Sequence, residues 1–119
     1  MHTKKDIEQL AEKFIFCQKT LTALGDPSRQ HIILEMMQMN DCNGSRVIGI
    51  TEKTDLSRPA VSHHLQILKD AGIVKMRKEG TMNYYYLDPD MKSFNCLAEL
   101  LQNSIQICEE LPDRSGEEF

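Results

Sequence analysis

The chain has 119 residues, 40% of them apolar and 27% charged, which bounds it to one domain built around a single small core. No run of the sequence approaches the roughly 18 apolar residues that cross a bilayer, and the first ten residues lack the apolar centre of a secretion signal, so we expect a cytoplasmic protein with no membrane contact. The four cysteines show no CxxC or CxxxH spacing, which argues against a zinc ribbon or knuckle; in a reducing compartment we expect thiols.

The charges are unevenly distributed along the chain. The formal net charge of −4 and the isoelectric point near 5.5 argue, taken alone, against nucleic-acid binding. Between Ser57 and Lys78, however, five basic residues stand against one acid, a local excess of +4 that leaves −8 for the remainder. The C-terminal stretch CEELPDRSGEEF carries five acids and one arginine. Phosphate attraction depends on the local field, so this asymmetry fits a nucleic-acid surface on an acidic body, although a solvated charged surface would look similar.

The N-terminal third predicts two helices. Apolar residues at alternating steps of three and four predict one amphipathic helix over residues 7–24 that ends at Gly25. Asp26 suits a helix N-cap and Pro27 the first helical position, so a second helix is expected from there to about Met39. The stripe of the first helix consists of Ile7, Leu10, Phe14, Cys17, Leu21 and Leu24.

A helix-turn-helix motif follows. After the turn-rich NDCNGS, the segment RVIGITEKT predicts a short third helix, although its branched apolar residues would also suit a strand. Ser57 is an N-cap candidate for a fourth helix that ends at Gly72, with Pro59 in its first turn. Two short helices joined by a tight polar turn are typical of a helix-turn-helix.

The rest of the chain predicts a hairpin and a last helix. IVKMRKEGTMNYYYLD has two β-prone runs around Glu79-Gly80, which predicts a β-hairpin with glycine at the turn. Asp88 and Pro89 repeat the cap-plus-proline pattern and start a helix that runs to about residue 110. The predicted fold class is therefore mainly α with a small β-hairpin.

The fourth helix has a buried and an exposed face. Consecutive helical positions are about 100° apart, so His63 and His64 cannot ligate one metal ion, and Ser62 turns its hydroxyl away from both rings. No GxSxG motif, carboxylate pair or phosphate loop accompanies them, so we expect no enzyme. His64 is expected to be a partly buried structural residue, and His63 either contacts nucleic acid or is an idle surface residue. Val61, Leu65 and Leu68 share the buried face, flanked by Ala60, His64 and Ile67, and Arg58, Ser62, His63, Gln66 and Lys69 lie largely opposite.

The exposed face of this helix offers donors and small side chains that fit a DNA major groove. Arginine can pair with both acceptors of guanine and glutamine with adenine, each good bidentate pair contributing roughly 1 to 3 kcal/mol of discrimination. Polar residues around the hairpin turn can hold phosphates or reach a minor groove. Tyr85 should lie opposite Tyr84 and Tyr86, and their packing against helices is favoured over a stacking platform for single strands. The candidate DNA-binding residues are Ser57, Arg58, Pro59, Ser62, His63 and Gln66 in the helix, and Arg77, Lys78, Thr81 and Asn83 in the hairpin.

The stretch from LTALGDPSRQHIILEM through LSRPAVSHHLQILKDAGIVKMRKEGTMNYYYL resembles the ArsR/SmtB family of bacterial winged-helix repressors. The resemblance covers about two thirds of the chain, and VSHHLQILKDAGIV is its most specific part. It implies a winged helix-turn-helix with a recognition helix at 57–71, a wing at 73–87, homodimerisation through the first and last helices, and repression relieved by an inducer. It agrees with a structural His64. The expected domain spans 1–111, and 112–119 is expected to be an acidic flexible tail.

The metal sites of that family have no counterpart in this sequence. Its sensors carry a Cys-x-Cys in the third helix or Asp/His pairs on the last helix. Here Arg46 and Ile48 take the places of the two cysteines, and the last helix has no histidine, with Met91 near the place of the first one. We therefore expect no metal and no cofactor, and the sequence does not identify the inducer.

The last helix predicts a homodimer from its own pattern. A helix that is apolar over so much of its circumference needs two partners, its own body and another subunit, and the first helix has a similar stripe. Recognition helices about 34 Å apart would read half-sites one turn apart in palindromic double-stranded operator DNA. One apolar face consists of Met91, Phe94, Ala98, Leu101, Ile105 and Cys108, and the other of Leu97, Leu100, Ile107 and Leu111.

The cysteines and the acidic charge leave two alternatives. Cys17 and Cys108 belong to apolar stripes and are expected in the core, whereas Cys42 lies in a polar loop. Cys96 and Cys108 are about 18 Å apart along one helix and cannot bridge within a chain. Some members of the resembled family sense sulfide or oxidants through a cysteine after the second helix and one late in the last, which implies Cys42 with Cys108 as a thiol sensor. The second alternative is a winged-helix adaptor that binds protein rather than DNA.

Overall fold

The computed structural model describes residues 4–39 and 44–112, and within these ranges the chain forms six helices and one two-stranded antiparallel sheet. The expected tail falls almost entirely on residues 113–119, which lie outside the described residues. No helix in the described part is long and apolar enough to span a membrane. The elements are α1 Lys4–Phe16, α2 Gln18–Leu24, α3 Pro27–Met39, α4 Val47–Lys53, α5 Arg58–Asp70, β1 Val74–Glu79, β2 Met82–Leu87 and α6 Met91–Glu109.

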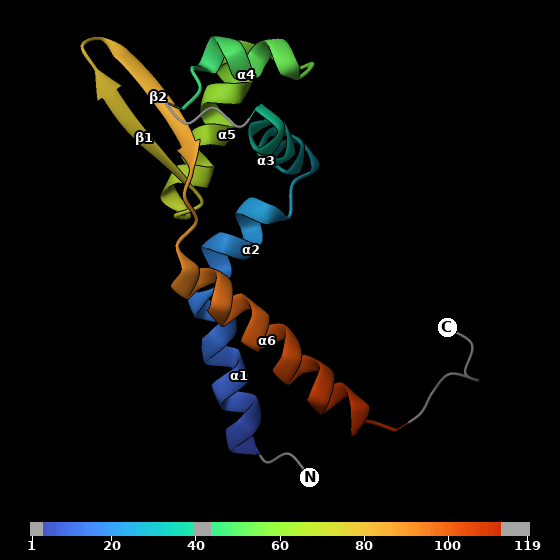
Figure 1. Cartoon of the computed structure of the whole chain (residues 1–119). Helices are drawn as coiled ribbons and strands as arrows, with labels where there is room; N and C mark the ends of the chain where they lie inside the picture. The colour runs from blue at the N-terminus through green and yellow to red at the C-terminus, as the bar shows by residue number, and fades with distance from the viewer. Residues whose placement is uncertain (1–3, 40–43, 113–119) are drawn as a thin grey trace.

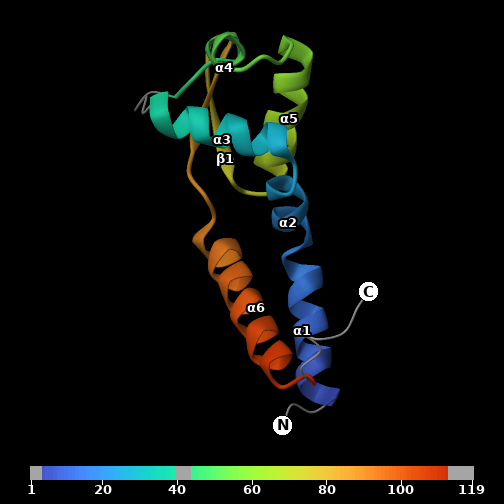
Figure 2. The ribbon, with the colours of Figure 1, turned by 90° about the vertical axis from the view of Figure 1, so that its right-hand side faces the viewer.

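The elements are arranged as a head and a stem. The head consists of α3, α4, α5 and the hairpin, and the stem consists of α1 and α6, which pack on each other (Figures 1 and 2). α2 continues from α1 toward the head and contacts α3, α5 and α6. The result is an elongated molecule of 57 × 31 × 22 Å. This is a winged helix-turn-helix, as the sequence predicts.

The hydrophobic core lies in the head. Residues from five elements and from the turn between α5 and β1 meet there, and most of their side chains have no contact with solvent. Burying a branched aliphatic side chain of this kind stabilises the fold by roughly 1.5 to 3 kcal/mol. The core consists of Ala23, Ile32, Ile33, Met36, Ile50, Val61, Leu65, Leu68, Ile73 and Val74. α5 supplies three of these residues, so its orientation is fixed by packing.

The predicted ends of α5 are confirmed. The side chain of Ser57 accepts a hydrogen bond from the backbone N–H three residues later at 3.3 Å, which caps the N-terminus. At the other end, the N–H groups of Gly72 and Ile73 donate to the carbonyls of Lys69 and Leu68, each at 3.0 Å. This is a Schellman motif, and it requires the left-handed backbone that Gly72 adopts at φ +77°. The glycine therefore ends the helix and turns the chain into the wing.

The prediction of a single first helix over residues 7–24 is wrong, because the structure divides it at Cys17. α1 packs on α6 and has no fully buried residue, whereas α2 buries Thr20 and Ala23. The apolar stripe therefore serves two neighbours, and Cys17 lies where the contact passes from one to the other. Residues 47–53 are helical, so the strand alternative for this segment is also wrong.

The start of the last helix is also corrected. Asp90, and not Asp88, caps α6, because its carboxylate accepts a hydrogen bond from the backbone N–H of Lys92 at 3.0 Å. The carboxylate of Asp88 instead accepts a hydrogen bond from the ammonium of Lys75 at 2.6 Å, and this ion pair closes the base of the wing. The N–H of Asp90 donates to the carbonyl of Gly72 at 2.9 Å, so the connection is held extended until residue 90 and the helix begins two residues later than expected.

The wing has an attachment that the sequence does not reveal. β2 pairs with β1 on one side, and on the other side Tyr85 exchanges two backbone hydrogen bonds with Ser45, at 2.7 and 2.8 Å. Gly44 permits this approach, because a Cβ atom there would lie 3.0 Å from the carbonyl oxygen of Tyr85. Tyr85 packs against the core, in agreement with the expectation that some of the three tyrosines pack against the helices. The wing is thus tied to the segment that leads into α4.

Substitution of Leu65 by alanine should lower the free energy of unfolding by about 2 to 5 kcal/mol, because it opens a cavity in the fully buried face of α5. Urea denaturation followed by circular dichroism measures this. The control is Ser62→Ala on the exposed face of the same helix, which should change stability by less than about 0.5 kcal/mol. Equal losses from both would contradict this assignment of the two faces.

Candidate nucleic-acid interface

The predicted DNA contacts of α5 lie together on its exposed side. The buried side chains of Val61, Leu65 and Leu68 hold the opposite side against the core. The residues so exposed are Ser57, Arg58, Pro59, Ser62, His63 and Gln66. In two perpendicular views, the N-terminal end of α5 and the tip of the wing lie at the same end of the molecule, away from the chain termini (Figures 1 and 2). One surface therefore combines a helix face with a hairpin tip.

Gln66 is already engaged within α5. Its amide donates to the carboxylate of Asp70 at 2.9 Å, one helical turn further on. Both side chains are exposed, so water can replace this bond at little cost. Gln66 would have to exchange this partner to pair with a base.

The two histidines have different environments. Their rings are 5.9 Å apart between centroids and tilted by 52°. His63 is exposed, whereas His64 is half-buried, with Nδ1 lying 3.2 Å from Nη1 of Arg29. Arginine can only donate, so Nδ1 accepts and the neutral ring carries its proton on Nε2. The prediction of a structural His64 agrees with this contact.

Arg29 is the residue that sequence reasoning missed. It is buried, and each of its three guanidinium nitrogens has an acceptor: Nε reaches the carbonyl of Ala23 at 2.9 Å, Nη2 that of Thr22 at 3.0 Å, and Nη1 the ring of His64. The two carbonyls belong to the last turn of α2, where the carbonyl of Thr22 also accepts the backbone N–H of Gly25 at 3.3 Å. The signal was available, since Arg29 continues the apolar stripe of Ile32, Ile33 and Met36.

The same arginine completes the cap of α3. Its backbone N–H donates to the carboxylate of Asp26 at 3.1 Å, as the predicted N-cap requires. That hydrogen bond, with a further contribution from the guanidinium charge, lowers the pKa of Asp26 below its usual value. Asp26 therefore stays ionised at neutral pH.

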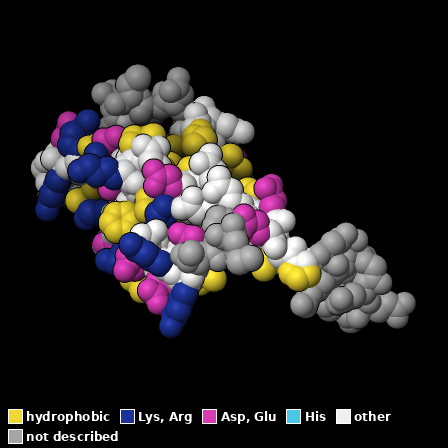
Figure 3. All heavy atoms as spheres, turned by 90° about the horizontal axis from the view of Figure 1, so that it is seen from below, with side chains coloured by type: hydrophobic (Ala, Val, Ile, Leu, Met, Phe, Trp, Pro, Cys, Tyr) yellow, Lys and Arg dark blue, Asp and Glu magenta, His cyan; other side chains and the backbone are white. Residues whose placement is uncertain are grey.

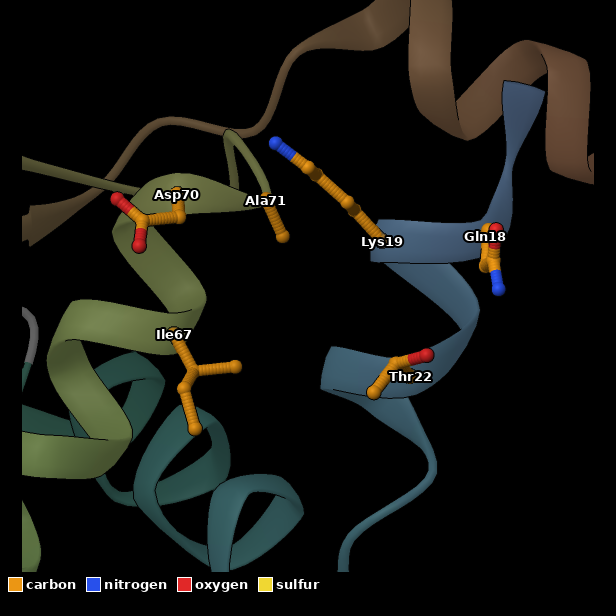
Figure 4. A pocket seen from close by; sticks show the side chains of 6 residues that line it. All are labelled: Gln18, Lys19, Thr22, Ile67, Asp70 and Ala71. Atoms are coloured by element: carbon orange, nitrogen blue, oxygen red, sulfur yellow. The ribbon is translucent and has the colours of Figure 1, made fainter. Parts of the chain in front are cut away.

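A cavity of about 440 Å³ separates α2 from the C-terminal end of α5 (Figure 4). Gln18, Lys19 and Thr22 line it from α2, and Ile67, Asp70 and Ala71 line it from the end of α5. Because the two helices stand apart here, the bonds from Arg29 to the carbonyl of Thr22 and to His64 provide a polar link between them. The position of α5 relative to the stem thus depends on a buried polar contact as well as on the core.

The wing carries the predicted basic residues at its tip. Lys78, Thr81 and Asn83 are exposed. The guanidinium of Arg77 lies 5.1 Å from the ring centroid of Tyr84, and its Nε is 3.3 Å from the carboxylate of Glu79. Arg77 is therefore held along the strand by a cation–π contact and an ion pair.

The opposite end of the molecule has a different surface. Seen from below, acidic and basic side chains alternate, with hydrophobic atoms between them (Figure 3). Neighbouring charges of opposite sign partly cancel each other's field, and salt screens what remains over roughly 8 Å at physiological ionic strength. The described residues visible in this view therefore do not form a surface of one charge sign, which phosphate binding favours.

Metal ligands and the proposed thiol pair can be placed only in part. Among residues 4–39 and 44–112, no three His, Cys, Asp or Glu side chains come together as a metal site. Cys17 is buried, as expected, but Cys108 is exposed, so its expected place in the core is wrong for this single chain. Cys42 lies outside the described residues.

Comparison with known proteins assigns this architecture to a family. The family model for "Bacterial regulatory protein, arsR family" matches residues 26–76. An uncharacterised HTH-type transcriptional regulator of Methanocaldococcus jannaschii is 44% identical over 80 residues, which cover 66% of this chain and 85% of the relative. The arsenical resistance operon repressor of Staphylococcus xylosus is 31% identical over 98 residues, which cover 82% of this chain and 90% of that protein.

Solved structures agree on the fold. The crystal structure of an ArsR family transcriptional regulator has a TM-score of 0.64 at 18% identity, and the alignment covers 86% of this chain and 96% of that one. A winged helix-turn-helix DNA-binding domain from Mycobacterium bovis, described as homodimeric, has a TM-score of 0.56 at 19% identity, with 95% and 97% covered. At these identities the likeness shows the fold alone.

Replacing Arg29 by methionine should destabilise the fold by about 2 to 4 kcal/mol, because the carbonyl of Ala23 and the ring of His64 lose this donor and the carbonyl of Thr22 keeps only the N–H of Gly25. A double-mutant cycle with His64→Ala should give a coupling of about 0.5 to 3 kcal/mol, measured by urea denaturation. Gln30→Met is the matched control: its amide also reaches α2, donating to the carbonyl of Leu24 at 2.7 Å, but it is exposed to water. A loss from this control as large as that from Arg29→Met would contradict the role assigned to burial.

Proposed function

The chain belongs to the ArsR family of bacterial DNA-binding transcriptional regulators, and on this premise we propose that it is a homodimeric repressor that binds a palindromic operator and is released by an inducer. The observation that carries the proposal is the exposed face of α5 beside the basic wing tip. The family consists of regulators rather than enzymes.

The helix face is proposed to read bases. Arg58 lies in the first turn of α5, whose N-terminus projects toward the end of the molecule where the wing tip lies. In helix-turn-helix proteins, N-terminal residues of the second helix contact base edges in the major groove. Arg58 can pair with guanine, and Gln66 with adenine once it leaves Asp70. Ser57, Pro59, Ser62 and His63 complete the contact surface.

The wing is proposed to hold the DNA backbone. Lys78 at the exposed tip neutralises a phosphate, and Thr81 and Asn83 donate to phosphate or sugar oxygens. Arg77, aligned by Tyr84, extends the basic surface toward an adjacent minor groove. Contacts of this kind add affinity for any sequence, whereas the contacts from α5 discriminate between sequences.

The partner of the stem is proposed to be a second copy of the chain. Several large apolar side chains on α1 and α6 are exposed in the single chain, although each helix packs on the other. Apolar surface on this scale marks an association site. The residues are Ile7, Phe14, Ile15 and Phe16 on α1, and Met91, Leu101 and Ile105 on α6, followed by Leu111. A two-fold pairing through them would present two copies of α5 to one face of DNA.

The identity of the inducer is not carried over from the metal-sensing relatives. Arg46 and Ile48 stand where those sensors have the cysteines of the third-helix site, and α6 contains no histidine. We propose that the chain does not respond to metals through those two sites. A thiol sensor formed by Cys42 and Cys108 remains the alternative that the family resemblance implies.

Arg58→Ala should weaken binding to operator DNA by about 1 to 3 kcal/mol and random DNA far less, because it removes a base contact. Lys78→Ala should weaken both alike and lower the slope of log K against log salt by about one, because it removes one phosphate contact. Fluorescence anisotropy on the protein's own promoter and a scrambled duplex, at two or more salt concentrations, measures both. Indistinguishable losses from the two variants would overturn the division between helix and wing, and equal weak binding of the unaltered protein to both duplexes would favour the adaptor.

The double variant Leu101→Glu/Ile105→Glu should raise the dimer dissociation constant at least about tenfold, a cost of about 1.4 kcal/mol, because it places charges in the proposed interface. Sedimentation velocity over a concentration series measures this. Leu34→Glu on α3 is the matched control, since Leu34 is 57% exposed and the two interface residues are 53% and 56% exposed. If the double variant remained as dimeric as the control, the partner surface would be elsewhere.

A further inference from the structure

Two cysteines that are far apart in the sequence meet where the stem joins α2. Cys17 is the single residue between α1 and α2, and Cys96 lies in the second turn of α6. The two side chains lie close enough for Cys96 to contribute to the raised pKa of Cys17. Cys17 is completely buried and Cys96 half-buried. This pair shares neither member with the Cys42 and Cys108 pair.

Packing on both sides holds the two thiols in place. α6 contacts both α1 and α2, so it spans the junction that Cys17 occupies. One turn before Cys17, the ammonium of Lys13 lies 3.7 Å from the carboxylate of Glu99, which follows Cys96 by three residues. The ion pair and the thiol pair are therefore successive contacts along one seam between the helices.

The surroundings give the two thiols different roles. Cys96 lines a cavity of about 520 Å³ between α1 and α6, together with Gln9, Glu12, Lys13, Phe16 and Lys92. Small solutes can reach Cys96 through this opening. Burial, and then the hydrogen bond with Cys96, raises the pKa of Cys17 to about 11, so Cys17 is a thiol at neutral pH. Cys96 is thus the cysteine that an oxidant reaches first. Cys17 is the resolving cysteine, which attacks the oxidised sulfur of Cys96.

We propose that Cys17 and Cys96 form a redox-active pair that closes to an intramolecular disulfide when a hydroperoxide reaches the cavity. The sulfur of Cys96 attacks the peroxide, the O–O bond breaks, and Cys96 becomes a sulfenic acid with release of water or an alcohol. The sulfur of Cys17 then attacks the sulfenic sulfur, the S–O bond breaks, and the hydroxyl group leaves as water with the proton of Cys17. Two thiols lose two electrons, and the peroxide gains them.

Proximity offsets the poor ionisation of Cys17. The raised pKa of Cys17 leaves little of its thiolate at neutral pH. Groups held in reacting geometry reach effective concentrations of about 10⁵ to 10⁸ M, so the neighbouring position of Cys17 favours its attack. A thiol in contact with the sulfenic acid therefore competes with further oxidation of Cys96.

The cross-link would act on the elements proposed to bind DNA, and this consequence rests on the proposed function. A disulfide brings its sulfur atoms to about 2.05 Å, closer than a hydrogen-bonded pair, so α6 is drawn toward α2. α6 starts shortly after the wing. The backbone N–H of its cap residue, Asp90, donates a hydrogen bond to the carbonyl of Gly72 at the end of α5. We expect the shift to reach α5 and the wing, and to lower operator affinity.

The first experiment maps the disulfide. The double variant Cys42→Ser/Cys108→Ser keeps the proposed pair as its only cysteines, and the unaltered chain is tested beside it, each with hydrogen peroxide. Digestion must cleave after Glu99 as well as after Lys92, because Cys96 and Cys108 otherwise share one peptide. We expect peptides containing Cys17 and Cys96 to be joined by a reducible link in a monomeric chain. Disulfides confined to Cys42 and Cys108, links only between chains, or a Cys96 that proceeds to sulfinic acid would overturn the pair.

Single variants test the two roles. Cys96→Ser should abolish the link, whereas Cys17→Ala should leave a sulfenic acid on Cys96 that dimedone traps. Because Cys17 is buried, Cys17→Ser serves as a second variant in case alanine unfolds the chain. If dimedone trapped a sulfenic acid on Cys17 in the Cys96→Ser variant as fast as it traps one on Cys96 in the Cys17→Ala variant, the assignment of roles would be overturned.

The second experiment measures operator binding. Peroxide should weaken binding by the unaltered chain at least tenfold, dithiothreitol should restore it, and Cys96→Ser should not respond. A mapped disulfide with unchanged affinity would overturn the regulatory consequence. Absence of operator binding by the reduced protein would count against the proposed function, whereas the mapping decides the pair independently.

Discussion

The buried guanidinium of Arg29 sets the relation between the two parts of this molecule. It satisfies two carbonyls at the end of α2 and the ring of His64 on α5, and its backbone N–H completes the cap of α3. A buried cation is tolerated only when its donors are all used, so the three helices must keep their mutual positions. Core packing fixes α5 within the head, and this contact fixes the direction in which the stem leaves it.

Local sequence signals predicted the elements that depend on local physics. The Ser57 cap, the Gly72 stop and the Glu79-Gly80 turn are each set by backbone chemistry within a few residues, and the structure has them. What escaped prediction depends on contacts between distant segments. The first helix breaks at Cys17 although the apolar stripe continues through it, and its neighbours change there. Asp90 replaces Asp88 as the cap of α6 because Asp88 pairs with Lys75, and Ser45 pairs with β2 across forty residues of chain.

The candidate site was predicted in the same uneven way. The exposed face of α5 followed from helical periodicity, which needs no knowledge of the partners. The contacts of Gln66 with Asp70 and of Arg77 with Glu79 could not be predicted from periodicity, because they depend on side-chain conformations. These internal partners partly neutralise the surface. The net charge of −4 acts in the same direction, because an acidic chain is repelled by the phosphates of any DNA sequence.

The two ends of the wing differ in how they are held, because β2 is attached on both sides at its base. Its base is bound to Ser45 on one side and to β1 on the other, whereas a side chain added at Gly80 would meet nothing within 4 Å. Residues can therefore be inserted or removed at the tip without disturbing the register that anchors the strand. Within such a fold, the length and reach of the wing can change independently of the helix that we propose reads sequence, without rebuilding the core.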